Sequence, residues 1–177
     1  MPLSTLLDSL LGTVPEAELN SYQGLSLLVE LLNRAEKRLM IREANLLPEI
    51  WENENVIEGL TNFLKKNNSS LKLAFHKDCD KLMAITKLKQ DNPGLSRLIC
   101  QYAGKIETYW WKEGYDVRPH MIVSDRDACI EHHFKGVNYM AHFYFDTEVK
   151  RWTVLFDGAA KGDSLEKMRG EDFRSNL

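Results

Sequence analysis

The sequence predicts an α/β domain in which helices flank a mixed sheet. Between residues 25 and 75 the apolar residues switch twice from helical spacing to a short apolar run. This helix–strand–helix–strand order is typical of an α/β layer with right-handed crossovers. The chain of 177 residues is also 44% hydrophobic and 28% charged, a balance that suits one domain with its own core.

The first half of the chain contains two predicted helix–strand units. The first helix is expected from apolar residues at helical spacing, namely Leu25, Leu28, Leu32 and Ala35. The apolar run 39–41 should then form a strand. A second helix, ended by the polar stretch "NNSS", is expected from one apolar face, namely Val56, Ile57, Leu60, Phe63 and Leu64. Residues 71–75 should form the strand that follows.

Two more helices and a strand are expected in the middle of the chain. Residues 79–90 predict one helix. Asn92 as the cap and Pro93 as the first helical residue predict another, which should end at Gly104. The segment 105–111 predicts a strand.

The last third of the chain should add a hairpin, a strand and a helix. Two short strands, 120–125 and 128–133, are expected to join at the "DRD" turn, and 140–145 should form another strand. Asp146 is expected to cap a helix with one shared face, namely Val149, Trp152, Thr153 and Phe156. The chain therefore divides into a helical N-terminal arm (1–24), an α/β domain (25–160) and a polar C-terminal tail (161–177).

Composition narrows the class of protein. The net charge of −3 argues against a surface that coats nucleic acid broadly, although a local basic patch is compatible with it. The three cysteines form no CxxC pair, so free thiols in the cytoplasm are expected. The N-terminal segment does not resemble a secretory signal, and no run of about 18 apolar residues predicts a membrane span.

The stretch "RPHMIVSDRDACIEHH" at 118–133 gathers polar residues that could carry chemistry. His132 and His133 are adjacent in a predicted strand, so their side chains should point to opposite faces. Cys129 and His142 are near, but no pair repeats the spacing of a zinc site. We therefore expect no metal and no other cofactor, since nucleotide-binding glycine loops are also missing from the sequence.

These segments resemble one half of a phospholipase D-like domain over residues 25 to about 160. The resemblance rests on "LLNRAEKRLMIREANL", "SSLKLAF", "RPHMIVSDRDACI" and "FDTEVKRWTVLFDGAAKGD". The family signature is His-x-Lys-x4-Asp. His120 stands at its first position and Asp127 at its last, but Ile122 replaces the lysine. Asn138 lies where the family often has a polar site residue.

The resemblance implies a phosphohistidine mechanism, but this chain lacks the lysine that the mechanism uses. In active members one histidine attacks phosphorus, a second protonates the leaving group, and the lysines stabilise the phosphate charge. Losing one such donor costs about 100- to 1,000-fold in rate. We therefore expect a degenerate, non-catalytic member. The alternative is a metal-independent phosphodiesterase or nuclease, active as a homodimer with His120 and Asp127 in its site.

Each candidate residue also has a structural interpretation. The structural interpretation is favoured for both signature residues: His120 as a hydrogen-bonded residue at a strand edge, and Asp127 as a turn residue of the hairpin. Trp110 and Trp111 are adjacent, so one ring should face the core and the other should face outward.

The outward tryptophan ring is a candidate binding element. With Lys112 and Arg118 nearby, it could form a protein contact or stack on a nucleic-acid base, or another element of the fold could cover it. The sequence thus predicts a binding or regulatory module without a membrane association. A homodimer and a protein partner are expected, with nucleic acid or a phosphate ligand as a further partner near His120.

Overall fold

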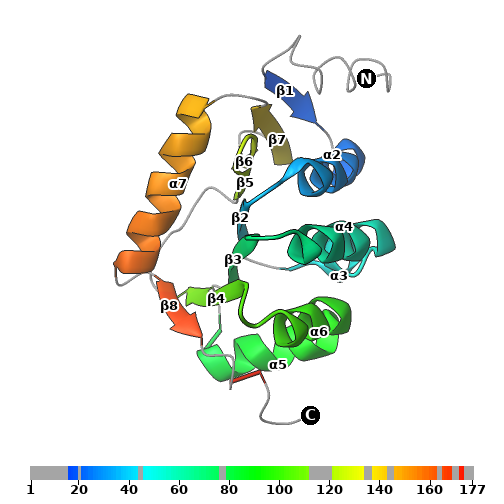
Figure 1. The fold of residues 1–177 in the computed structure, drawn as a ribbon, viewed down its shortest axis with the longest axis vertical. Coiled ribbons are helices and arrows are strands. Elements are labelled where there is room, and N and C mark those ends of the chain that lie inside the picture. The colour runs from blue at the N-terminus through cyan, green and yellow to red at the C-terminus, as the bar shows by residue number, and fades with distance from the viewer. Residues whose placement is uncertain are drawn as a thin grey trace.

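The fold is built on one mixed sheet of eight strands (Figure 1). This computed structural model describes residues 16–19, 21–43, 46–75, 79–111, 121–133, 137–142, 146–162, 165–168 and 172–173; the side chains of 16–24, 27, 128–142 and 148 lie outside the description. The strands are β1 (Glu16–Leu19), β2 (Arg38–Glu43), β3 (Ser70–Phe75), β4 (Ile106–Trp111), β5 (Met121–Ser124), β6 (Ala128–His133), β7 (Val137–His142) and β8 (Leu165–Met168). The helices are α2 (Ser21–Arg34), α3 (Pro48–Trp51), α4 (Glu54–Lys65), α5 (Lys81–Asp91), α6 (Pro93–Gln101) and α7 (Asp146–Lys161).

The strand order is β1-β7-β6-β5-β2-β3-β4-β8. Strands β2, β3 and β4 are parallel neighbours, and β5 lies antiparallel to β2. On one side the sheet continues through the antiparallel β5–β6 hairpin, β7 and β1, and on the other side β8 pairs antiparallel with β4. The predicted mixed sheet, its flanking helices and the hairpin are therefore confirmed.

The sheet separates two hydrophobic cores. Helices α2 to α6 lie on one face and α7 crosses the other (Figure 1). The larger core joins β2, β3 and β5 to α2, α3, α4, α5 and α6, with Phe63, Phe75 and Leu32 completely buried within it. The smaller core lies under α7, whose Val149, Trp152 and Phe156 pack against the sheet. The face predicted for the last helix is thus the face that it buries.

Side chains cap several helices at their first turn. Asn53 accepts a hydrogen bond from the Asn55 N–H at the start of α4, and Asp80 accepts one from Met83 N–H at the start of α5. Such caps satisfy backbone donors that have no partner inside the helix.

Asn92 occupies the predicted capping position of α6, but its side chain makes no capping hydrogen bond. Its amide donates instead to the buried Leu46 carbonyl oxygen at 2.9 Å. The Glu52 carboxylate accepts from Gly94 N–H at 2.9 Å and from Leu95 N–H at 3.0 Å. A Cβ at position 94 would approach a Glu52 oxygen to 2.7 Å, so glycine allows this carboxylate to reach the helix start.

The two ends of the chain contribute strands that the sequence did not predict. β1 pairs with β7 at one edge of the sheet, and β8 pairs with β4 at the other edge. Met168 and Phe173 are buried in the larger core, so this part of the predicted polar tail belongs to the packed fold. Residues 1–15 of the predicted helical N-terminal arm lie outside the described residues, and β7 begins three residues before the strand expected at 140–145.

Candidate functional site

The carboxyl ends of β2, β3 and β4 meet at one edge of the sheet. Because these strands are parallel, the chain leaves all three at the same edge. Antiparallel β5 enters the sheet there, with Met121 opposite Arg42. The segments 44–45, 76–78 and 112–120, which adjoin this edge, lie outside the described residues. Open α/β sheets bind ligands outside the carboxyl ends of their strands, so this edge is the first place to look for a site.

Arg42 is the buried cation of this edge. Its side chain is 5% exposed, and its guanidinium carbon lies 5.4 Å from the centroid of the Trp111 ring. Among the described residues it has no ion pair, and its buried Nε has no hydrogen-bond partner. Burial lowers the pKa of Arg42 to about 10, which still leaves it charged at neutral pH.

The sequence of three strands explains why Arg42 reaches Trp111. Met40 and Arg42 alternate with Leu39 and Ile41, so Arg42 points to the α7 face of the sheet. Ala74 is its partner on β3, and a methyl group leaves room for a long side chain to cross that strand. Trp111 stands on β4 just beyond, two residues past the partner of Ala74. The guanidinium therefore lies toward the carboxyl edge.

The two predicted tryptophans lie on opposite faces of β4. Trp111 is fully buried in the smaller core, beneath Arg42. Trp110 packs partly buried against the larger core, and its indole N–H donates to the Cys79 carbonyl oxygen at 2.8 Å. The structure therefore covers both rings to a large degree. Lys112, Arg118 and His120, the other binding residues predicted here, lie outside the described residues.

Ile122 occupies a position in the larger core. Its side chain is 9% exposed and belongs to the cluster that β5 shares with helices α2 to α6. Its neighbours Met121 and Val123 face the opposite core, under α7. The residue at the lysine position of the resemblance is thus a packing residue of the sheet.

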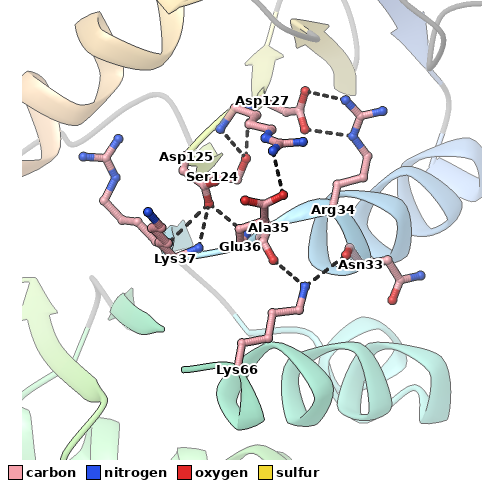
Figure 2. Close-up of polar contacts among 11 residues, drawn as sticks. Asn33, Arg34, Ala35, Glu36, Lys37, Lys66, Ser124, Asp125 and Asp127 are labelled. Carbon is pink, nitrogen blue, oxygen red and sulfur yellow. Dashed lines mark hydrogen bonds and ion pairs between the residues drawn. The ribbon is translucent and has the colours of Figure 1, made fainter. Parts of the chain in front are cut away.

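Asp127 lies at the opposite end of β5, in the turn that leads to β6. Its carboxylate is completely buried and receives two hydrogen bonds from Arg34, Nε at 2.9 Å and the terminal nitrogen at 3.0 Å (Figure 2). Bidentate pairs of this kind are among the strongest polar contacts in proteins. The contact ties the end of α2 to the hairpin, so the described geometry of Asp127 agrees with its interpretation as a turn residue.

Hydrogen bonds fill the rest of this turn. Asp125 accepts from the backbone N–H groups of residues 36, 37 and 38 at 2.9, 3.1 and 3.3 Å (Figure 2). The Ser124 hydroxyl oxygen accepts from the N–H groups of residues 126 and 127. Burial alone would raise the pKa of Asp125, but the backbone N–H donors outweigh it and lower this pKa below its ordinary value. These contacts define how the chain passes from α2 into β2.

The remaining predicted site residue is Asn138, on β7. Its backbone lies opposite His132 of β6, but the side chains of both strands lie outside the description. Within the described part of the chain, no group of three or more His, Cys, Asp or Glu side chains could hold a metal ion. No helix in that part is both long enough and apolar enough to span a membrane.

A cavity of about 500 Å³ lies at the other end of β4. It is lined by residues of β4, β8 and the turn after α6, including Ile99, Gly104, Ile106, Thr108 and Met168. Its volume is in the range of small-molecule sites. Lys167, a cation in its lining, is hydrogen-bonded to Glu107.

Arg42 is a candidate that the sequence analysis missed. The signal was an arginine in the strand "RLMIRE", whose other central residues are apolar. A strand that pairs on both sides buries such a residue. The tryptophans and the signature-like residues after them carry more conspicuous patterns in the sequence.

Comparisons with known proteins support the fold. No family model matches the sequence, and no curated protein matches it significantly. Similar solved structures include the phospholipase D family member Nuc of Salmonella typhimurium, with a TM-score of 0.59 and 8% identity over 87% of this chain and 97% of that one. Phosphatidylserine synthase of Haemophilus influenzae Rd KW20 has a TM-score of 0.61 and 9% identity over 90% of this chain.

A third similar structure is TrmBL2, an archaeal chromatin protein with a novel mode of DNA binding. Its TM-score is 0.58 and its identity 10%, over 88% of this chain. This chain spans 58% of TrmBL2 and 41% of the synthase. Together with the mixed sheet and its flanking helices, these likenesses establish a phospholipase D-like α/β fold.

Proposed function

We propose that this chain is a phospholipase D-like module that binds its ligand without cleaving it. Its first expected ligand is nucleic acid, contacted near the carboxyl edge of the parallel strands. A protein partner and a homodimer remain part of the proposal, as does a cytoplasmic location. The alternative is a metal-independent phosphodiesterase or nuclease that is built as a homodimer around His120.

The position of Ile122 carries this proposal. Its side chain is 9% exposed and packs in the larger core, where the signature would need a lysine. An aliphatic side chain offers neither a charge nor a hydrogen bond to a phosphoryl group, and one lost donor costs about 100- to 1,000-fold in rate. Two copies in a homodimer would lack both lysines.

Nucleic acid is favoured as the ligand for two reasons. TrmBL2, which shares the fold, is a chromatin protein that binds DNA. Arg42 is also a cation without an acidic partner among the described residues, and the sequence between β4 and β5 contains Lys112, Arg118 and His120. A local positive site is compatible with the overall charge of −3, because phosphate contacts act over short distances in salt.

A cleavage assay tests the absence of catalysis. The full chain is incubated with single-stranded and duplex DNA in EDTA, beside His120→Ala. We expect both proteins to leave the DNA intact. Cleavage by the wild-type chain that His120→Ala abolishes would replace this proposal with the phosphodiesterase alternative.

A binding titration tests the choice of ligand. Fluorescence anisotropy with labelled oligonucleotides at several salt concentrations measures the affinity and its salt slope. The double variant Lys112→Gln/Arg118→Gln should weaken binding and reduce the slope by about 1.4 for single strands. The double variant Lys65→Gln/Lys87→Gln removes the same charge from exposed helix positions and should change neither. If the wild-type chain does not bind at low salt, nucleic acid is excluded in favour of a protein partner.

A further inference from the structure

We infer that Arg42, held on the Trp111 ring, is the contact residue for one phosphate-class oxyanion at the carboxyl edge of β2, β3 and β4. The inference deepens the proposed function by naming the residue and the chemical group that it recognises. It does not require catalysis, and it does not depend on which molecule carries the phosphate.

The first argument is the missing counter-charge. Arg42 is 5% exposed, and no carboxylate among the described residues pairs with it. A buried charge is strongly unfavourable unless it is paired and hydrogen-bonded. Burial lowers the pKa of Arg42, and no acidic neighbour among the described residues offsets this shift. An anion that binds here would supply the missing partner.

The second argument is a comparison with other cations that are partly buried in this fold. Arg34 binds the Asp127 carboxylate, and Lys72 lies 2.6 Å from Asp157. Lys105 donates to the carbonyl oxygens of residues 64 and 66, at 2.7 and 2.8 Å. Each of these three cations has an oxygen partner, although each is more exposed than Arg42. Arg38, at the opposite end of β2, also has an unpaired Nε among the described residues, but it is only half-buried. Arg42 differs from it by its deeper burial and by its place at the edge where ligands of α/β sheets bind.

The Trp111 ring holds the Arg42 guanidinium at a fixed position. Trp111 covers it at 5.4 Å from the ring centroid and is itself fully buried, so the ring provides a fixed support. A guanidinium carries five N–H donors in one plane and accepts no hydrogen bonds, so every polar atom of the Arg42 side chain is a donor for an anion. A planar fork of donors suits two oxygens of a phosphate group. Sulfate has the same shape, whereas acetate is a smaller, planar anion.

A thermal unfolding experiment tests the inference without knowing the natural ligand. The full chain is melted in sodium phosphate and in sodium chloride at equal pH and ionic strength. At about 100 times the dissociation constant, phosphate should raise the Tm by about 5–10 °C, because it binds the folded state alone. Arg42→Met should lose this increase. Its Tm in chloride should equal or exceed that of the wild type, because the unpaired buried charge has gone.

Arg38→Met provides a matched control. Arg38 lies on the same strand and the same face, four residues earlier, and its Nε is also unpaired among the described residues. It is half-buried and lies at the opposite end of β2 from the carboxyl edge. The substitution changes the net charge equally, so a general electrostatic effect of phosphate would alter both variants alike. The phosphate-induced increase should remain in Arg38→Met.

Two further variants keep the test decisive if Arg42→Met does not fold. Arg42→Lys retains the charge but loses the fork of donors, so phosphate should bind at least about tenfold more weakly in calorimetric titration. Trp111→Phe keeps an aromatic ring and should retain phosphate binding at reduced affinity. An equal phosphate response in wild type, Arg42→Met and Arg42→Lys would overturn the inference. So would an equal response to acetate, which would assign the site to carboxylates.

The outcomes also separate this inference from the proposed function. A chain that binds oligonucleotides but shows no Arg42-dependent phosphate response retains the proposed function and refutes the inference. A chain that cleaves DNA through His120 refutes the proposed function, while the Arg42 response can still be measured with inorganic phosphate. An Arg42-dependent response to both phosphate and a short oligonucleotide supports nucleic acid as the source of the phosphate.

Discussion

An arginine that is largely removed from solvent lies at each end of the β2–β5 strand pair, and the two arginines differ in their partners. At the hairpin end, Arg34 makes two hydrogen bonds to the buried Asp127 carboxylate. At the carboxyl edge, four residues beyond the start of β2, Arg42 lies over the Trp111 ring and has no acidic partner among the described residues. The described part of the chain thus supplies a carboxylate for Arg34 but none for Arg42.

This difference separates a structural end from a candidate binding end. Sequences that fold well satisfy their buried polar groups, and the exceptions concentrate at functional sites. The turn around Asp127 follows the rule, since its neighbours Ser124 and Asp125 also accept backbone hydrogen bonds. Arg42 departs from the rule. We therefore expect substitutions at the hairpin end to lower stability, and substitution of Arg42 to change ligand binding instead.

The largest loss of stability is expected from Asp127→Asn. The substitution leaves Arg34, with a side chain only 14% exposed, beside a neutral amide. Breaking a buried pair by removing one partner costs about 3–5 kcal/mol. Because Arg34 reaches some solvent, we expect about 3 kcal/mol in urea-induced unfolding, with an unchanged m-value.

Glu36→Gln is the control for Asp127→Asn. It removes a carboxylate from the same end of the sheet, but its side chain is 50% exposed. The control should lie within about 0.5 kcal/mol of the wild type. If Asp127→Asn were equally mild, the buried pair would not be what distinguishes the hairpin end, and the comparison with Arg42 would lose its basis.

A smaller and pH-dependent loss is expected from Asp125→Asn. The carboxylate accepts three backbone N–H groups, and its pKa is lowered from the ordinary value of 3.8. A group whose folded pKa is depressed stabilises the fold above its unfolded pKa and loses that contribution as the pH falls through its folded pKa. Since the site is partly exposed, we expect about 1 kcal/mol at pH 7.

The pH profile of Asp125→Asn gives the decisive measurement. The difference in unfolding free energy from the wild type should be constant above about pH 5 and should shrink below about pH 4. A difference that persists unchanged to about pH 2 would mean that the charge of Asp125 does not matter. The stability difference would then arise from the shape and hydrogen bonding of the carboxyl group and not from its charge.

The sequence predicted the central part of the fold because its strands and helices have clear periodicity. Alternation and short apolar runs located β2, β3, β4 and the β5–β6 hairpin. The edge strands β1 and β8 were missed, since each has four residues and a short strand carries little pattern. Their place in the sheet depends on pairing with β7 and β4, which lie far away in the sequence.

The candidate site was harder to predict for a related reason. The sequence favoured a turn residue at Asp127 and left a catalytic role as the alternative, but it did not identify the partner of the carboxylate. Its described contact is with Arg34, 93 positions earlier, and no local pattern reports such a distance. Arg42 became a candidate because no carboxylate among the described residues pairs with it. That observation requires the arrangement of β2, β3 and β4 in the folded sheet, which the sequence does not show.

The smallest effect is expected from the exposed ion pair between Arg126 and Glu36 at the hairpin end. A terminal guanidinium nitrogen of Arg126 lies 2.6 Å from Glu36 Oε1, but the side chains of Arg126 and Glu36 are 47% and 50% exposed. Exposed pairs contribute about 0.2–1 kcal/mol and are screened by salt. A double-mutant cycle with Arg126→Met and Glu36→Gln should therefore give a coupling of about 0.3 kcal/mol at low salt and almost none at about 1 M salt. A coupling above about 1 kcal/mol that resisted salt would mean that this exposed ion pair contributes substantially to the stability of the turn. Burial of the Arg34–Asp127 pair would then not be the feature that distinguishes the hairpin end from Arg42, which has no acidic partner among the described residues.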